Sequence, residues 1–321
     1  MTKNPFGIRG DFTTAPNISR LFSEMVAIWT VNFWESLGSP KKFNLIELGA
    51  GNGEMMKVMI ESFKKFPSFL QGCNIIIFEK SPNLIKKQKK NINFKNIKWA
   101  KNLKKFTKLP SIFLANEFFD AIPIKQFLKE GDIWYEKFVN ISDEKKISFI
   151  KKKINIKNLN KRLSFKISHK QNFIEYSPLA LDYLKHILKT IKKNKGGLLI
   201  IDYGYFAEKM KDTLKAIHDK KHSMVLENVG NSDITYNINF HFINRIVNKF
   251  SNLNSCYTSQ NKFLTNLGIY QRAEIISKNK TFNDKADIFY RIKRLVDENQ
   301  MGKIFKVMLI KNSDNKSQTG F

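Results

Sequence analysis

The 321-residue chain has only two cysteines, Cys73 and Cys256, and they stand alone. Neither has the spacing of a metal site or of a disulfide framework, so we expect no metal and a reducing compartment, with the cytoplasm as the default. No apolar stretch approaches the ~18 residues of a membrane-spanning helix. The start, MTKNPFGIRGDF, lacks the apolar stretch of a signal peptide.

Arginine is also scarce: it supplies seven of the 56 basic residues in a chain of net charge +28. A strongly basic surface suits nucleic acid. However, the abundant residues Lys, Asn, Ile and Phe all have AT-rich codons, so genomic base composition explains the charge equally well. Few guanidinium groups also disfavour specific base recognition. We therefore do not expect a nucleic-acid partner.

Apolar periodicity predicts helices and strands that alternate along most of the chain. Such alternation predicts an α/β fold, a mostly parallel sheet with helices on both faces. Expected strands begin at residues 43, 74 and 111 and cover 196–206, 254–259 and 303–311, and expected helices cover 17–37, 54–66, 82–90, 178–193, 240–250, 260–267 and 285–297.

The pattern changes in two places. Residues 128–173 contain strand-like segments separated by polar turns, which indicate a β-rich, hairpin-containing insertion. Residues 207–239 are expected to be irregular. We expect one domain over 1–312 and a disordered polar tail over 313–321.

A glycine loop follows the first strand in the stretch ELGAGNGE, with Gly49, Gly51 and Gly53 two residues apart. A P-loop would need Lys followed by Ser or Thr, and the dinucleotide fingerprint would need G-x-G-x-x-G. Glu47 near the strand end would repel a pyrophosphate but attract a cation. The loop thus favours an adenosine-like ligand that is positively charged at its centre.

Glu79 ends the next strand, where a carboxylate can accept hydrogen bonds from both ribose hydroxyls of an adenosine. The alternative is an ion pair with a neighbouring lysine. Together with the glycine loop, Glu79 points to S-adenosylmethionine as the cofactor. Methyl transfer from a sulfonium needs alignment more than activation by the protein. A chain without a Cys-His or Ser-His pair fits this chemistry.

The stretch ANEFFDAIP places Asn116, Glu117 and Asp120 after the following strand, and Asp202 ends the strand after that. Because the carboxyl ends of parallel strands share one edge of the sheet, these side chains are expected at the same cleft. Two carboxylates could hold a guanidinium or orient an amine. Alternatively, Glu117 caps the following turn and Asp120 is solvated.

Several motifs in series resemble the MidA family: GDF with T-x-P, E-L-G-x-G-x-G, N-E-F-F-D-A-x-P, I-D-Y-G, D-I-T, L-G-I-x-Q-R-A and M-G-x-x-F-K-V. The matches run from Gly10 to about Val307. This family comprises class I S-adenosylmethionine-dependent methyltransferases with a Rossmann-like fold. Its mitochondrial members are regarded as assembly factors of respiratory complex I that methylate arginine in one of its subunits.

The resemblance implies that the glycine loop and Glu79 hold S-adenosylmethionine, with Glu47 and Asn116 beside it. The turn Gly10, Asp11 and Phe12 would help to cover the cofactor. Glu117, Asp120 and Asp202 would face an acceptor on a protein such as a respiratory complex I subunit. These three are the expected catalytic residues.

The chain also departs from the family pattern. Family members usually begin several tens of residues earlier, and Asn239 stands where the family usually has Asp. The later start leaves open an assembly factor that works by contact without catalysis. The basic charge leaves open a second alternative, a nucleic-acid methyltransferase. The sequence leaves the oligomeric state open.

Overall fold

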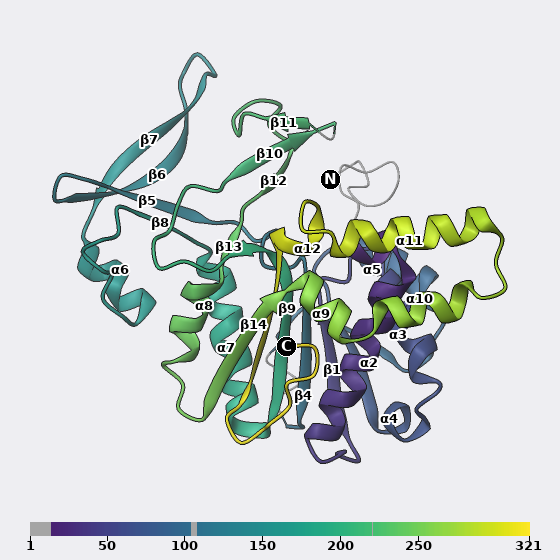
Figure 1. Ribbon diagram of the computed structural model, residues 1–321. Helices are drawn as coiled ribbons and strands as arrows, with labels where there is room; N and C mark the ends of the chain where they lie inside the picture. The colour runs from purple at the N-terminus through teal and green to yellow at the C-terminus, as the bar shows by residue number, and fades with distance from the viewer. Residues whose placement is uncertain (1–13, 104–107, 220) are drawn as a thin grey trace.

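A central sheet organises the chain in the computed structural model, which describes residues 14–103, 108–219 and 221–321 (Figure 1). The strand order is β14-β15-β9-β4-β1-β2-β3, and the short β13 pairs with the end of β9. Among the described strands of this path, β15 runs antiparallel to both of its neighbours, β14 and β9, and the remaining neighbouring pairs are parallel. The strands are β1 (Phe43–Leu48), β2 (Cys73–Phe78), β3 (Ile97–Ala100), β4 (Ser111–Asn116), β9 (Gly196–Tyr205), β13 (Ile238–Asn239), β14 (Leu253–Ser259) and β15 (Phe305–Asn312).

Both faces of this sheet are covered, because successive strand residues enter two different apolar clusters. Leu45 of β1 belongs to the cluster on the side of α2, whereas Ile46 belongs to the cluster on the side of α7. Every residue of β1 is buried, as expected of a central parallel strand. The α/β prediction is confirmed. The covering helices include α2 (Arg20–Ser36), α3 (Glu54–Phe63), α4 (Pro67–Gly72), α5 (Pro82–Asn91), α7 (Pro178–Asn194) and α8 (Phe240–Val247).

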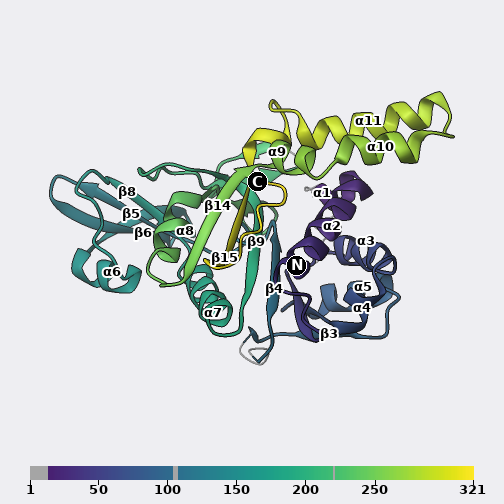
Figure 2. The same cartoon turned by 60° about the horizontal axis from the view of Figure 1, so that its bottom comes forward.

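The C-terminal part adds helices to the α2 side of the sheet. A pair of them, α10 and α11, extends away from the body of the molecule (Figure 2). Neither α10 nor β3 was predicted from the sequence. The added helices are α9 (Gln260–Asn266), α10 (Ile269–Ser277), α11 (Phe282–Val296) and α12 (Met301–Ile304).

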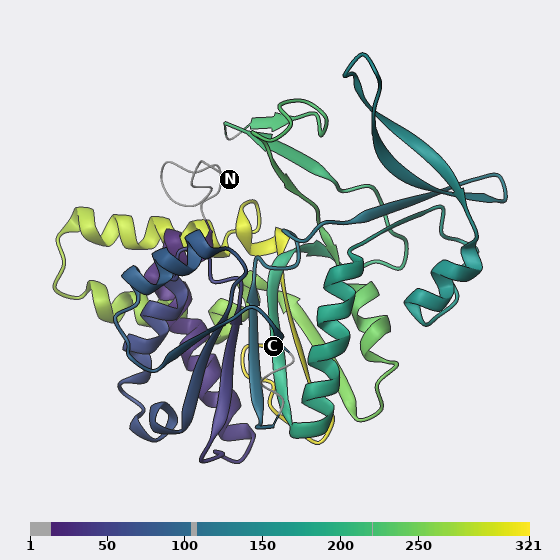
Figure 3. The ribbon, with the colours of Figure 1, turned by 180° about the vertical axis from the view of Figure 1, so that it is seen from behind.

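Two antiparallel sheets rise beyond the carboxyl edge of the central sheet (Figures 1 and 3). The first has the order β7-β6-β5-β8 and is the expected insertion, although it spans 125–176 rather than 128–173. Its elements are β5 (Lys125–Glu130), β6 (Ile133–Ile141), β7 (Ile147–Ile154), α6 (Ile156–Leu163) and β8 (Phe173–Tyr176).

The second small sheet corrects the expectation of an irregular segment over 207–239. Its order is β11-β10-β12, formed by β10 (Lys215–His218), β11 (Lys221–Ser223) and β12 (Asp233–Thr235). These strands are three or four residues long and mostly polar, so they carry no readable alternation.

The tail over 313–321 also differs from the disorder that we expected. Asn315 is buried and donates a hydrogen bond to Ser36, and the ring of Phe321 packs on Phe263. Both contacts are with residues distant in sequence, which the composition of the tail does not reveal. The division into one domain over 1–312 stays a prediction.

Candidate functional site

The glycine loop lies between the end of β1 and the start of α3. Gly49 and Gly53 adopt positive φ angles of 67° and 86°, a region that side chains disfavour. A Cβ on Gly49 would lie 2.9 Å from Cδ2 of Phe118, and a Cβ on Gly53 would lie 2.9 Å from Cδ1 of Ile92. The tight turn and the close approach of Phe118 together require glycine at position 49.

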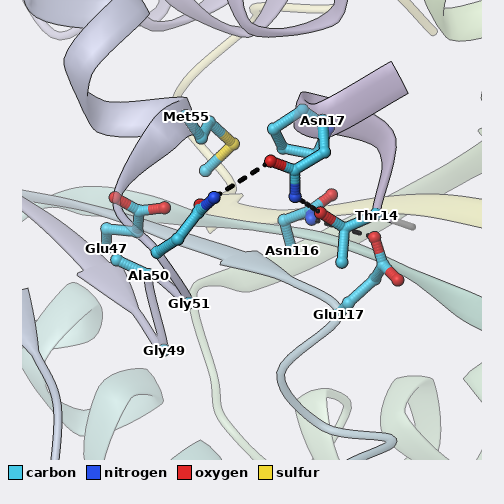
Figure 4. Close-up of a pocket in the computed structure, with 11 residues that line it drawn as sticks. Thr14, Asn17, Glu47, Gly49, Ala50, Gly51, Met55, Asn116 and Glu117 are labelled. Carbon is cyan, nitrogen blue, oxygen red and sulfur yellow. Dashed lines mark hydrogen bonds between the residues drawn. The ribbon is translucent and has the colours of Figure 1, made fainter. Parts of the chain in front are cut away.

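A cavity opens beside this loop at the topological switch point of the sheet. From β1 the chain continues on one side through β2 and β3, and then returns to β4 on the other side. Ligands of doubly wound sheets bind at such a point, outside the carboxyl ends of the strands. The cavity is lined by Thr14, Pro16, Asn17, Glu47, Gly49, Ala50, Gly51, Asn52, Met55, Asn116 and Glu117 (Figure 4).

The short helix α1 (Ala15–Ile18) lies over one side of this cavity. Asn52 of the glycine loop donates to Oδ1 of Asn17 at 3.0 Å, and Asn17 donates to Oγ1 of Thr14 at 2.8 Å (Figure 4). The backbone amide of Ala15 donates to Oε1 of Glu117 at 3.3 Å. The expected cover residues Gly10, Asp11 and Phe12 lie outside the described residues, but the residues from Thr14 onward do border the cavity.

Glu47 contributes an unpaired carboxylate to the cavity. Its side chain is 3% exposed, and Oε2 has no hydrogen-bond partner among the described residues. Burial, together with the nearby charge of Glu79, raises the pKa of Glu47 from 4.5 to about 8. A buried acceptor without a donor is costly, and a cationic ligand in the cavity would remove that cost. This agrees with the cation expected from the sequence.

Glu79 lies at the end of β2 but is not among the residues that line the cavity. Its Oε1 accepts the backbone amides of Lys80 and Ser81 at 2.8 and 2.9 Å. Its Oε2 accepts from Nε2 of Gln88 at 3.3 Å. These contacts fix the carboxylate at the carboxyl edge, and its predicted role toward ribose stays a prediction.

Gln88 is a site residue that sequence reasoning missed. Its side chain is fully buried on α5, and Nε2 also donates to the carbonyl oxygen of Gly51 at 2.9 Å. Trp99 of β3 donates to its Oε1 at 3.0 Å. Gln88 therefore connects the glycine loop to the end of β2. A glutamine in the basic stretch KKQKK gives no sequence signal, because the helix looks solvated throughout. The structure shows that Gln88 is the buried position of α5.

Glu117 follows β4 in a strained backbone conformation. Its φ angle is +49°, in the left-handed region that costs a non-glycine residue about 1–3 kcal/mol. Burial, and secondly the charge of Asp120, raises the pKa of Glu117 to about 8. Next to it, Oδ1 of Asn116 is buried, and no described residue donates a hydrogen bond to it. The strained turn holds both side chains at the cavity (Figure 4).

Asp202 and Asp120 are two buried carboxyl groups near Glu117. Asp202 is fully buried, and its oxygens accept the backbone amides of Phe119, Asp120 and Tyr203 at 3.0, 3.4 and 2.9 Å. Burial and the charge of Asp120 raise the pKa of Asp202 well above its ordinary value. Asp202 thus holds the turn after β4 and does not line the cavity.

Asp120 is held by a distant residue. Oγ1 of Thr235, at the end of β12, donates to Oδ2 of Asp120 at 3.1 Å. Burial raises the pKa of Asp120 to about 6, and this hydrogen bond acts in the opposite direction. Oδ1 of Asp120 is buried without a partner among the described residues.

The arrangement brings five predicted residues to the cavity wall: Glu47, Gly49, Gly51, Asn116 and Glu117. Gly53, Glu79, Asp120 and Asp202 lie around it without lining it. The unpaired atoms named above are all acceptor oxygens, so a fitting ligand supplies donors or positive charge. Within the described ranges, no group of three or more His, Cys, Asp or Glu residues could hold a metal ion.

Comparison with known proteins gives one family match. The family model described as "Putative S-adenosyl-L-methionine-dependent methyltransferase" matches residues 25–258. No described helix is both long and apolar enough to cross a membrane.

Two similar curated proteins carry the same name. The protein named "Protein arginine methyltransferase NDUFAF7, mitochondrial" from Xenopus laevis is 27% identical over 95% of this chain and 75% of its own length. Its human counterpart is 27% identical over 94% of this chain and 74% of its own length.

Among solved structures, a Burkholderia thailandensis protein bound to S-adenosyl-homocysteine superposes with a TM-score of 0.83 at 21% identity. The superposition covers 99% of this chain and 84% of that chain, and it shows that the two share a fold.

Proposed function

We propose that this protein methylates a nitrogen atom of arginine in another protein. The chain belongs to the family described as putative S-adenosyl-L-methionine-dependent methyltransferases, whose model matches residues 25–258. The expected family and cofactor are confirmed by the match. The arginine acceptor is the proposal. The names of the similar curated proteins support it, at identities of 26–28%.

One observation carries the choice of acceptor: Oδ1 of Asp120 is buried and has no partner in the part of the chain that the structure describes. Asp120 is also close enough to Glu117 for its charge to raise the pKa of Glu117. A guanidinium brings several N–H donors and a positive charge, and it can satisfy two carboxylates at once. A hydroxyl acceptor brings one donor and no charge. Two carboxyl groups at the acceptor side therefore favour a cationic nitrogen.

When bound, S-adenosylmethionine supplies a methyl group on a positively charged sulfur. Glu47 would face that charge, and the glycine loop would hold the cofactor at the switch point. Asp120 and Glu117 would orient the guanidinium so that a nitrogen lone pair points at the methyl carbon. Glu117 would accept the proton that this nitrogen loses, because a pKa of about 8 suits proton transfer near neutral pH.

The protein substrate would be a subunit of respiratory complex I, as the family resemblance implies. This proposal rests on the resemblance alone. A cytoplasmic location stays a prediction from the cysteine content and the N-terminal sequence.

The test of the cofactor site is calorimetric titration of S-adenosylhomocysteine into wild type and Glu79→Ala. We expect the variant to bind at least about tenfold more weakly, because hydrogen bonds to a charged acceptor contribute about 1.5–3 kcal/mol each. Lys80→Ala is the matched control, since its side chain is exposed and only its backbone amide contacts Glu79.

The test of the acceptor is transfer of radiolabelled methyl groups from S-adenosylmethionine to arginine-containing and lysine-containing peptides and to RNA. We expect transfer to arginine only, and a loss of about 100-fold or more in Glu117→Gln but not in the exposed Glu144→Gln. Binding of S-adenosylhomocysteine without transfer to any substrate would instead favour a non-catalytic role by contact.

A further inference from the structure

The helix pair α10 and α11 leaves aromatic side chains open to solvent. Among the described residues, the most exposed large apolar side chain is Phe282 at the start of α11, at 84%. Phe289 and Tyr290 of the same helix are 38% and 63% exposed. The two helices form the top of the molecule in Figure 2, so these rings are carried on an outlying part of it.

The exposed rings lie along one side of α11. Phe289 follows Phe282 by seven residues, which is about two helical turns, so both rings point to the same side. Ala286 lies between them, and Tyr290 is next to Phe289. We call Phe282, Ala286, Phe289 and Tyr290 the α11 stripe. Exposed apolar surface that is continuous in this way indicates an interaction site.

The opposite side of α11 is fixed to the rest of the molecule. Arg291 follows Phe282 by nine residues, about two and a half turns, and therefore points away from the stripe. Its Nη1 donates to the carbonyl oxygen of Ile18 in α1 at 3.1 Å, and its Nε pairs with Asp287 at 2.7 Å. The stripe is thus turned away from α1 and toward solvent.

Basic residues flank the stripe at both of its ends. Lys278 and Lys280 precede it in the exposed turn between the two helices, and Lys293 and Arg294 follow it. Residues 275–283 contain no acidic residue. Asp284 comes two residues after Phe282, more than half a turn around the helix, and so points away from the stripe. The surface is therefore aromatic in the middle and positively charged at its ends.

This arrangement fits an anionic lipid surface better than other partners. Aromatic rings can enter the headgroup region of a bilayer, while lysines beside them reach the anionic headgroups. A nucleic acid carries charge along its whole length and would call for basic residues along the stripe itself. A second copy of a chain with net charge +28 would be repelled, whereas an anionic surface attracts it.

The other hairpin that projects from the molecule, β6-β7, lacks this combination. It exposes Val139 and Ile141, but its turn carries Asp143 and Glu144, which an anionic surface would repel. It therefore serves as a control surface on the same protein.

We propose that the α11 stripe binds the headgroup region of an anionic lipid bilayer without spanning it, with Lys278, Lys280 and Lys293 contacting lipid phosphates. Because Arg291 joins α11 to α1, which borders the cofactor cavity, this contact would set the orientation of that cavity relative to the membrane. The proposal is independent of the proposed function, since lipid binding requires no methyl transfer.

The test is flotation of the purified protein with vesicles made of equal parts phosphatidylcholine and phosphatidylglycerol, and with vesicles of phosphatidylcholine alone. We expect binding to the anionic vesicles to be about tenfold tighter or more, and to weaken as salt is raised above about 0.1 M. The double variant Phe282→Ser with Phe289→Ser should bind them about tenfold more weakly or less. Val139→Ser with Ile141→Ser, the matched control, should bind like wild type.

A second pair of variants separates local charge from net charge. Lys278→Ser with Lys280→Ser should weaken binding to anionic vesicles by about tenfold or more. Lys145→Ser with Lys146→Ser removes the same charge from the β6-β7 turn and should have little effect. All four double variants change exposed side chains, apart from the borderline Phe289, and unchanged melting temperatures verify that they are folded.

Three outcomes would overturn the proposal. Equal affinity for both kinds of vesicle would exclude recognition of anionic lipid, and unchanged binding by the Phe282 and Phe289 variant would exclude the stripe. Equal weakening by the two lysine variants would assign the binding to net charge alone. Absence of binding to any vesicle would overturn it as well, and would leave a protein helix as the partner of the stripe.

Discussion

Thr235 donates a hydrogen bond to Oδ2 of Asp120 at 3.1 Å across 115 residues of sequence. The contact joins the small sheet β11-β10-β12 to the turn after β4. It also favours the charged form of a carboxyl group whose pKa burial raises to about 6. The small sheet therefore affects the charge on the acceptor side, although it lies outside the central fold.

Replacing Thr235 by valine keeps the shape of the side chain and removes this hydrogen bond. The pKa of Asp120 should rise further, so that a more alkaline solution is needed to ionise it. We expect the acidic limb of the pH profile of kcat/KM to move up by about one pH unit. Methyl-transfer rates measured across the acidic and neutral range check this.

The matched control is Thr258→Val on strand β14, which lies at the far edge of the sheet. Its profile should coincide with that of wild type. If Thr235→Val lowered activity equally at every pH, the hydrogen bond would position the turn without setting the charge of Asp120.

Glu47 makes the ligand-free protein sensitive to pH. Its pKa is raised from 4.5 in the unfolded chain to about 8 in the folded one, so the folded state binds the extra proton between these values. The associated stability is present at low pH and is lost as the pH rises toward 8. We expect the melting temperature of the ligand-free protein to fall over this range, and to fall less in Glu47→Gln.

Between about pH 5 and about pH 8, the free energy of unfolding should fall more in wild type than in Glu47→Gln. The difference should be on the order of one kcal/mol per pH unit, and therefore a few kcal/mol at the alkaline end. Chemical unfolding at about pH 5 and about pH 8 measures it. Glu144→Gln, an exposed change in the β6-β7 turn, is the control and should leave the slope unchanged. If the free energy of unfolding changed equally with pH in wild type and in Glu47→Gln, Glu47 would not be protonated in the folded state.

The sequence predicted the parts of the site that depend on local pattern. A continuous apolar run followed by alternate glycines is sufficient to place Gly49 at the end of a buried strand. Because parallel strands share a carboxyl edge, the positions of Glu79 and Glu117 followed from the same argument. The central sheet was predictable for this reason, apart from the short strands β3 and β13.

Other features depend on contacts between residues far apart in sequence. Asp202 was expected to face the acceptor, but a carboxylate at a strand end can equally well accept backbone amides, as this one does. The bond from Thr235 to Asp120 exists only once the small sheet has folded over the turn. No periodicity marks such a contact, since Asp120 lies in a turn and Thr235 ends a strand of three residues.

Gln88 illustrates the same limit and gives a further prediction. Its side chain takes part in hydrogen bonds with Gly51, Glu79 and Trp99, all from inside the protein. Gln88→Ala removes these bonds and leaves buried groups unpaired. We expect a loss of about 2–4 kcal/mol in the free energy of unfolding, from bonds that contribute about 0.5–1.5 kcal/mol each. Affinity for S-adenosylhomocysteine should fall as the loop loosens.

Urea unfolding and calorimetry measure these two effects. Lys87→Ala, one residue earlier on the exposed side of α5, is the control and should change neither quantity by more than a few tenths of a kcal/mol. Lost stability with unchanged affinity would mean that the glycine loop keeps its conformation without Gln88.

Gly49 allows backbone strain to be separated from side-chain crowding. Both Gly49 and Gly38 adopt positive φ angles, 67° and 84°, but a Cβ on Gly38 would meet nothing within 4 Å. A Cβ on Gly49 would lie 2.9 Å from the ring of Phe118. We expect Gly38→Ala to cost about 1 kcal/mol of stability, and Gly49→Ala about 2–4 kcal/mol, since crowding adds to strain. Only Gly49→Ala should weaken the binding of S-adenosylhomocysteine, because its neighbours border the cavity.

Equal losses of stability in the two variants would show that the ring of Phe118 moves aside freely. In that case Gly49 would be required for its backbone conformation alone.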